Sequence, residues 1–115
     1  MMANMELSTR IDTVLRPLSI TRNMKAHSIL CQAVSLICEQ EDRLKAVQKE
    51  IYEPLAKQRC CYWTAVQSTI RRAAKTTWLT NPAYVQQLAG YPLTGGPSAV
   101  QFLEMIYNTV ARSEI

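Results

Sequence analysis

Apolar residues recur at helical spacing along most of the chain and predict a series of amphipathic helices. The pattern supports a first helix over about residues 6–16 and a second helix that begins after Asn23, which we expect to act as its N-cap. Strict alternation of apolar and polar residues, the mark of a half-buried strand, is absent. The stripe of the second helix consists of Ile29, Leu30, Ala33, Val34, Ile37 and Cys38.

Acidic residues and a proline divide the middle of the chain. Negative charge at positions 39–42 is typical of a helix start, so we expect a third helix there. Pro54 should end that helix and begin a short one that runs to about Arg59, because proline is well tolerated in a first turn. A tight turn over residues 60–63 should follow.

Two capping-box patterns predict the starts of later helices. Thr64 and Gln67 have the spacing in which each side chain bonds the backbone N–H of the other residue, so a helix should run from Thr64 to about Trp78. Ser98 and Gln101 repeat this spacing just before the last apolar stripe. The pattern therefore predicts a final helix after Ser98.

Between these two helices, Asn81 and Pro82 are typical of a helix start and Gly90 of a helix end. Together the segments predict an all-α fold, a compact bundle of about six helices that contains a helix-turn-helix. A chain of 115 residues with 48% hydrophobic composition is long enough to bury one core. We therefore expect a single domain over residues 6–112.

Composition argues against several other classes of protein. No apolar run reaches the length of about 18 residues that a membrane span needs, and the N-terminal residues lack the features of a secretory signal. We therefore expect a cytoplasmic protein without a membrane partner. Cys31, Cys38, Cys60 and Cys61 lack metal-site spacing, so reduced thiols and no metal or cofactor are predicted. His27 is expected to be a partly buried or surface histidine.

The distribution of charge is more informative than the formal net charge of +4. No acidic residue lies between Glu53 and Glu104, so a positive face is expected. Such a face fits nucleic-acid binding, but it equally fits a solvated helix surface that keeps a protein soluble. The basic residues of this stretch are Lys57, Arg59, Arg71, Arg72 and Lys75.

The segment from Pro54 to Trp78 is predicted to form a short helix, a brief turn and a longer helix. At helical spacing the longer helix has an apolar face and a cationic face. In a helix-turn-helix the first helix braces the second, which enters the major groove of DNA, and Ala56 is small enough for a close crossing. The apolar face holds Val66, Ile70, Ala73 and Thr77, and the outer face holds Ser68, Arg71, Arg72 and Lys75.

The chemistry of the outer residues suits DNA. Arg71 and Arg72 have planar guanidinium groups that bind guanine edges or phosphate, whereas Lys75 suits a phosphate. Gln67 has the donor and acceptor to pair with adenine. The candidate DNA-contacting residues are Thr64, Ala65, Gln67, Ser68, Arg71, Arg72 and Lys75, with Lys57 and Arg59 as further phosphate contacts.

Four motifs, in this order and spacing, resemble the C-terminal effector domain of the stage-zero sporulation response regulator family. They are Ile51-Tyr52-Glu53-Pro54-Leu55-Ala56-Lys57, the helix with Val66, Ile70, Arg71 and Ala73 that ends in Trp78, Gly90-Tyr91, and Pro97 followed by Phe102, Leu103 and Met105. The resemblance covers about residues 7–112. It implies an all-helical transcription regulator that binds double-stranded DNA through the helix from about Thr64, sometimes as dimeric or tandem copies.

The chain departs from the family in the reading helix. Where the family usually carries an arginine and then a Glu-Arg pair, this sequence has Ala65, Gln67 and Ser68. Arg71 is kept, and Arg72 stands at a usual histidine, so the family's base preference does not carry over. Family members also have an N-terminal phospho-receiver domain. Its acidic pocket is absent here, so we expect either an excised or stand-alone effector domain or a different form of regulation.

An enzyme and a protein-interaction module are the two alternatives to a DNA-binding protein. The sequence has no phosphate-binding loop and no recognisable catalytic grouping, so an enzyme is not expected. The vicinal pair Cys60-Cys61 suits a redox role, but small residues at such a turn more often serve packing. The serious alternative is a protein-interaction module that binds a regulator or RNA polymerase. The pair Tyr62-Trp63 would suit such a surface, and a core role for Trp63 is equally compatible with the sequence.

Overall fold

A computed structural model describes residues 4–112 of the chain, with side chains from residue 7. These residues form helices and no strand, which confirms the predicted all-α bundle of about six helices. The α-helices are α1 (Asn4–Leu15), α2 (Lys25–Glu39), α3 (Glu53–Gln58), α4 (Trp63–Thr80), α5 (Pro82–Ala89) and α6 (Ala99–Arg112). Shorter helical stretches are η1 (Arg16–Leu18), η2 (Glu41–Lys45) and η3 (Gln48–Tyr52).

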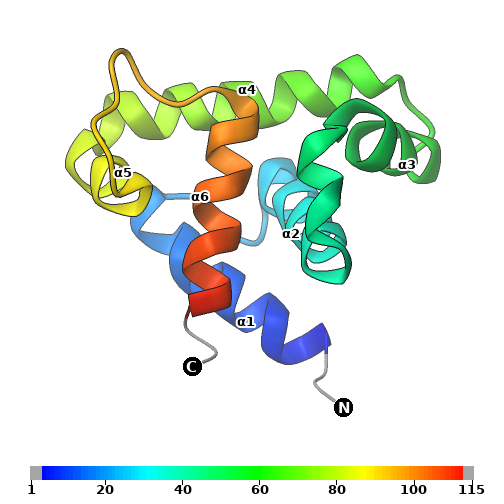
Figure 1. Ribbon diagram of the computed structural model, residues 1–115, viewed down its shortest axis with the longest axis horizontal. Helices are drawn as coiled ribbons and strands as arrows, with labels where there is room; N and C mark the ends of the chain where they lie inside the picture. Colours follow the sequence, from blue (N-terminus) through cyan, green and yellow to red (C-terminus); the bar gives the residue numbers. More distant parts are fainter. Residues whose placement is uncertain (1–3, 113–115) are drawn as a thin grey trace.

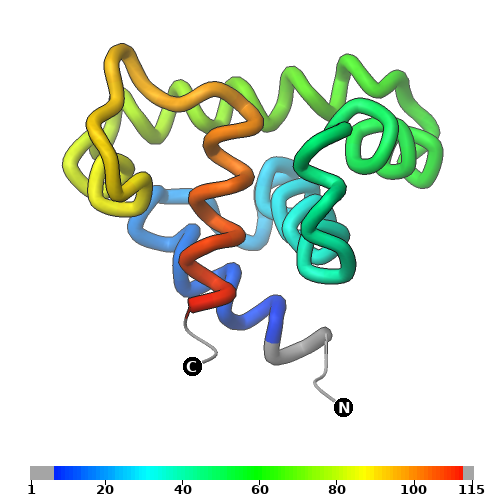
Figure 2. Tube along the Cα trace, viewed as in Figure 1, coloured from blue at the N-terminus to red at the C-terminus, as the bar shows by residue number. Residues whose placement is uncertain are grey.

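The bundle is organised around α6, which runs through its middle (Figure 1). This helix contacts α1, α2, α4 and α5, and its residues Phe102, Leu103 and Ile106 are fully buried. Helix α4 lies across one end of the bundle, so one side of it faces the core along its length (Figures 1 and 2). Within residues 4–112, no helix is both long enough and apolar enough to cross a bilayer.

The helix signals near the C-terminus are confirmed. The Ser98 amide donates to Oε1 of Gln101 at 2.9 Å, and the Gln101 amide donates to Oγ of Ser98 at 3.1 Å, which is a complete capping box. Asn81 caps α5 by accepting from the Tyr84 amide at 3.4 Å. Helix α5 ends at Gly90, whose φ of 76° is the left-handed conformation that glycine adopts without strain.

The predicted cap of the second helix is wrong. Helix α2 begins at Lys25 with Met24 at its N-cap, and no side chain caps it. The oxygen of Asn23 accepts a hydrogen bond from the hydroxyl of Thr21 instead. The short polar side chain is therefore used inside the preceding turn, a local alternative that competes with helix capping.

The third helix also differs from its prediction. The acidic residues begin only the short stretch η2, and the chain leaves helical geometry at Ala46 (φ −148°). From Gln48 to Gln58 the backbone then stays helical, so Pro54 does not end a helix but lies in the first turn of α3. Stretch η3 is a π-helix, and its wider turn leaves room for the proline ring beside the carbonyl one turn back.

A buried carboxylate joins α1 to α2. Asp12 is 3% exposed, and its Oδ1 lies 3.0 Å from Nε2 of His27, which is itself buried. Nη2 of Arg16 lies 2.9 Å from Oδ2, and Nε of Arg22 lies 3.7 Å from Oδ1. Asp12 is 15 residues away in sequence from His27, so the spacing around the histidine gave no sign of this partner.

This cluster makes stability depend on pH. Burial alone would raise the pKa of Asp12, but the hydrogen bond from His27 and the charges of Arg16 and Arg22 outweigh it and lower that pKa. A lowered pKa in the folded state stabilises the protein above the unfolded value of about 4, and this contribution is lost as pH falls further. In urea unfolding from pH 6 to pH 2.5, Asp12→Asn should therefore flatten the acid-side decline in stability. Parallel declines for variant and wild type would refute this role.

Candidate nucleic-acid interface

Helices α3 and α4 meet at a tight corner whose geometry comes from the backbone. The Cys61 amide donates to the Ala56 carbonyl at 2.9 Å, and the Cys60 amide donates to the Lys57 carbonyl at 3.4 Å. Cys60 between them has a left-handed φ of 56°. This is the Schellman pattern that closes helix ends, usually with glycine at the left-handed position. The predicted turn after the short helix is thus present.

The expected packing role of the two cysteines is wrong, since Cys60 and Cys61 are both exposed. A residue with a Cβ costs about 1–2 kcal/mol in the left-handed region, and the freedom that glycine gains in the unfolded chain offsets part of this. We expect Cys60→Gly to raise the free energy of unfolding by up to about 1 kcal/mol. Urea unfolding of this variant and of Cys61→Gly gives the comparison. An equal or larger gain for Cys61→Gly would contradict the explanation.

Helix α4 begins at Trp63, so the predicted capping box at Thr64 is wrong. Tyr62 occupies the N-cap in an extended conformation, and no side chain bonds the first amides. The ring of Trp63 stacks on the ring of Tyr52, with 6.3 Å between centroids and 2° between planes. This contact places Trp63 at the core edge, whereas Tyr62 is 84% exposed. Aromatic packing thus starts the helix one residue early.

The inner face of α4 is the one that the apolar pattern predicted. Val66, Ile70, Ala73 and Thr77 are all buried, and α4 continues to Thr80, two residues past the predicted end. The Thr77 hydroxyl donates to the Ala74 carbonyl at 3.0 Å, so this buried polar group is satisfied within the helix. The rotation of α4 about its axis is therefore set by the core.

The basic residues predicted for the outer face of α4 are exposed to solvent. The side chains of Arg71, Arg72 and Lys75 are exposed, and no residue in the described part of the chain forms an ion pair with any of them. Thr64 and Ala65 are also exposed, while Gln67 and Ser68 are half-buried. The guanidinium and ammonium groups are thus available to an external anion.

The two cations near the corner differ from one another. Lys57 is exposed on α3. Arg59 is half-buried, and its Nη1 donates to Oε1 of Gln32 at 2.7 Å and to Oγ of Ser28 at 3.2 Å. Arg59 therefore fastens the corner to α2, a positioning role that sequence reasoning missed because both acceptors lie about 30 residues earlier.

A short helix, a Schellman turn and a longer helix with a cationic outer face are together the parts of a helix-turn-helix DNA-binding domain. The family comparison agrees with this class. The model of the family described as the C-terminal domain of sporulation initiation factor Spo0A matches residues 11–110, so the chain belongs to this family. The family is one of DNA-binding domains of a transcription factor and not one of enzymes.

Proposed function

We propose that this domain is a sequence-specific transcription regulator that places the N-terminal half of α4 in the major groove of double-stranded DNA. The observation that carries the proposal is the two-sided character of α4. Ile70 is fully buried while its neighbour Arg71 is exposed without an ionic partner, so the core holds the cationic face outward. The helix therefore presents these cations to the solvent, where phosphates and base edges can reach them.

Each outer residue has a role suited to its position. Arg71 lies near the middle of α4 and has the planar fork that binds O6 and N7 of guanine. Arg72 and Lys75 suit phosphate, and Gln67 suits adenine. The small residues Ala65 and Ser68 permit close approach. We propose that the DNA phosphate backbone is contacted by Thr64, Lys57 and Arg59. Lys57 is the better candidate of the two cations because it is exposed, whereas Arg59 is half-buried and already donates to Gln32.

Selection of bound sequences from random duplex DNA tests this function. The proposal expects an enriched motif whose affinity falls steeply with salt, because each neutralised phosphate releases counterions. Lys57→Ala should lower the affinity equally for all duplexes and reduce the slope of log K against log salt by about 1. Recovery of no motif, together with salt-independent binding, would refute the proposal.

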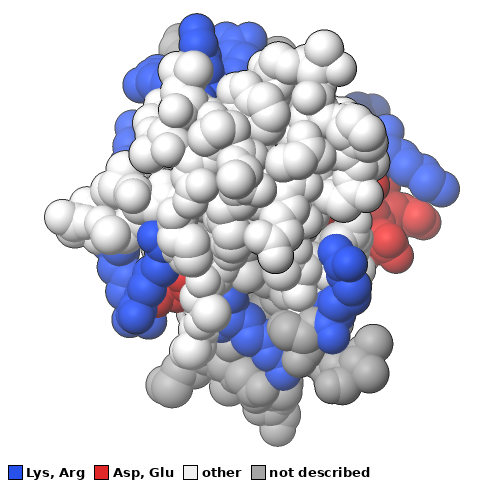
Figure 3. Space-filling view, turned by 90° about the vertical axis from the view of Figure 1, so that its left-hand side faces the viewer, with Lys and Arg blue, Asp and Glu red and all other residues white. Residues whose placement is uncertain are grey.

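A protein partner is the alternative, and one observation favours it. Residues 76–103 contain no charged residue, and they include Leu79 at 71% and Tyr91 at 43% exposure. Helix α5 lies on the side of the molecule that faces the viewer in Figure 3, where an uncharged face has both basic and acidic residues at its margins. Such a face suits RNA polymerase or a second copy of the domain on tandem sites.

The two functions differ in their response to salt. An uncharged contact should change little between 50 and 200 mM salt, whereas duplex binding through several cations should weaken by orders of magnitude. A role on DNA also agrees with the cytoplasmic location that the sequence led us to expect. If Leu79→Ser abolished transcription regulation by the protein but left its affinity for duplex DNA unchanged, the contact with the partner protein would be the essential one.

A further inference from the structure

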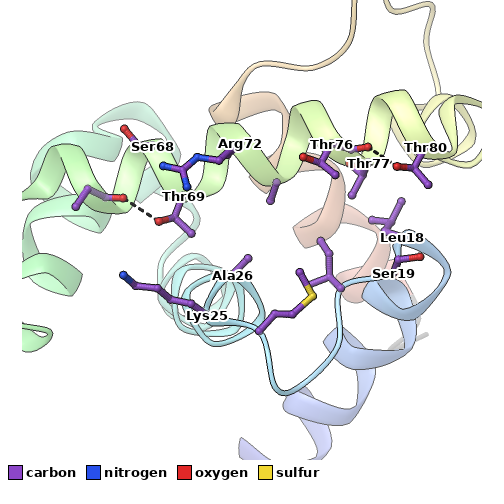
Figure 4. A pocket seen from close by; sticks show the side chains of 14 residues that line it. Leu18, Ser19, Lys25, Ala26, Ser68, Thr69, Arg72, Thr76, Thr77 and Thr80 are labelled. Carbon is purple, nitrogen blue, oxygen red and sulfur yellow. Dashed lines mark hydrogen bonds between the residues drawn. The ribbon is translucent and has the colours of Figure 1, made fainter.

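A groove with a volume of about 710 Å³ lies between α4 and the segment that joins η1 to α2 (Figure 4). This volume is within the range of about 300–1,000 Å³ that small-molecule sites occupy. One wall is the side of α4, and the opposite wall is the first turn of α2 with the loop before it. No role in the proposed DNA contact requires a hollow at this place.

The inner part of the groove is largely apolar. Leu18, Ile20 and Ala73 belong to the buried core and form part of its lining. The threonines of α4 add little unsatisfied polarity. The hydroxyl of Thr69 donates to the Ala65 carbonyl at 3.0 Å, and that of Thr80 donates to the Thr76 carbonyl at 2.8 Å. An apolar group that packs against Thr69 and Thr80 would therefore leave the donor hydrogen bonds of these two hydroxyls intact.

One end of the groove is cationic. Lys25 comes from the α2 wall and Arg72 from the α4 wall, and both side chains extend toward the end marked by Thr69 (Figure 4). No acidic residue lines the groove. Within residues 7–112, no side chain forms an ion pair with either cation. The lining thus combines an apolar body site with two cations that lack a counter-charge.

We propose that this groove binds a small amphipathic anion, with a carboxylate between Lys25 and Arg72 and an apolar body over Leu18 and Ala73. The charge complementarity and the volume carry the proposal, since a neutral ligand would leave both cations unused. Arg72 is also a proposed phosphate contact. Occupancy should therefore weaken duplex binding, a consequence that rests on the proposed function, whereas the binding of the anion does not.

Titration with octanoate, followed by amide chemical shifts in the ¹⁵N-labelled protein, tests the site without DNA. We expect saturable shifts confined to the groove residues and at least tenfold weaker binding of 1-octanol, which has the same chain without the charge. Combined Lys25→Gln and Arg72→Gln should weaken octanoate binding at least tenfold. Arg71→Gln removes one positive charge from α4 at a position outside the groove, so it should leave the affinity for octanoate unchanged. Absence of saturation, or equal losses in both variants, would overturn the proposal.

Ala26→Leu separates the groove from the DNA contact, because it fills the groove from the α2 wall and leaves α4 intact. Octanoate should lower duplex affinity of the wild type, and Ala26→Leu should abolish that effect while its duplex affinity without octanoate stays within twofold of wild type. If the wild type does not bind the duplex even without octanoate, the proposed function is refuted, but the proposal that the groove binds an anion is not. If Lys25→Gln weakens duplex binding and octanoate does not saturate, the groove holds a DNA phosphate and the proposal is wrong.

Discussion

Arg71→Ala should weaken binding to the preferred duplex by about 1–3 kcal/mol, or roughly 5- to 150-fold, and should reduce discrimination against a scrambled duplex. The reason is that this exposed guanidinium lies on the outer face of α4, where a bidentate contact to guanine specifies one base pair. Fluorescence anisotropy with both duplexes at one fixed salt concentration measures the effect.

Lys45→Ala is the matched control for this variant. It removes one positive charge from η2, which packs against α2 and η3, so it should change duplex affinity less than twofold. Equal losses for both variants would mean that only net charge matters. An equal loss of Arg71→Ala on both duplexes would mean that Arg71 contacts phosphate and reads no base.

Ile70→Ala should lower the free energy of unfolding by about 2–5 kcal/mol, because it removes a fully buried side chain and leaves a cavity under α4. Arg71→Ala, one residue later on the same helix, should change it by less than about 0.5 kcal/mol. Urea unfolding of the two variants gives the comparison. Similar losses for both would show that the core does not set the rotation of α4, and the proposed presentation of its cations would fail.

The fold was largely predictable where it depends on patterns within one segment. The apolar stripe of α4 identified Val66, Ile70, Ala73 and Thr77 as its inner face, and all four are buried. The same periodicity placed Arg71 on the outer face. Helix periodicity carries this information because a face is set by residues three or four apart, whatever the rest of the chain does.

Features that depend on distant residues were not predictable. The start of α4 at Trp63 follows from the stacking of this ring on Tyr52, and the capping pattern at Thr64 gave the wrong boundary. The bond between Asp12 and His27 and the anchoring of Arg59 on α2 likewise join residues far apart in sequence. Local capping signals succeed only where no tertiary contact competes with them.

The groove beside α4 also could not be predicted from the sequence, because its two walls come from distant segments of the chain. Lys25 was not among the predicted site residues, because it lies outside the segment from Pro54 to Trp78 and its position opposite Arg72 arises from the packing of α2 against α4. The left-handed conformation of Cys60 was also hidden, since glycine is the residue that usually indicates it.

Methylation interference on the selected duplex tests the central claim, that α4 reads the major groove, most directly. Methyl groups at guanine N7 lie in the major groove, whereas those at adenine N3 lie in the minor groove. We predict that N7 methylation within the selected motif blocks binding of the wild type and that Arg71→Ala becomes insensitive at one of these guanines. Interference confined to adenine N3, or at neither position, would contradict this account.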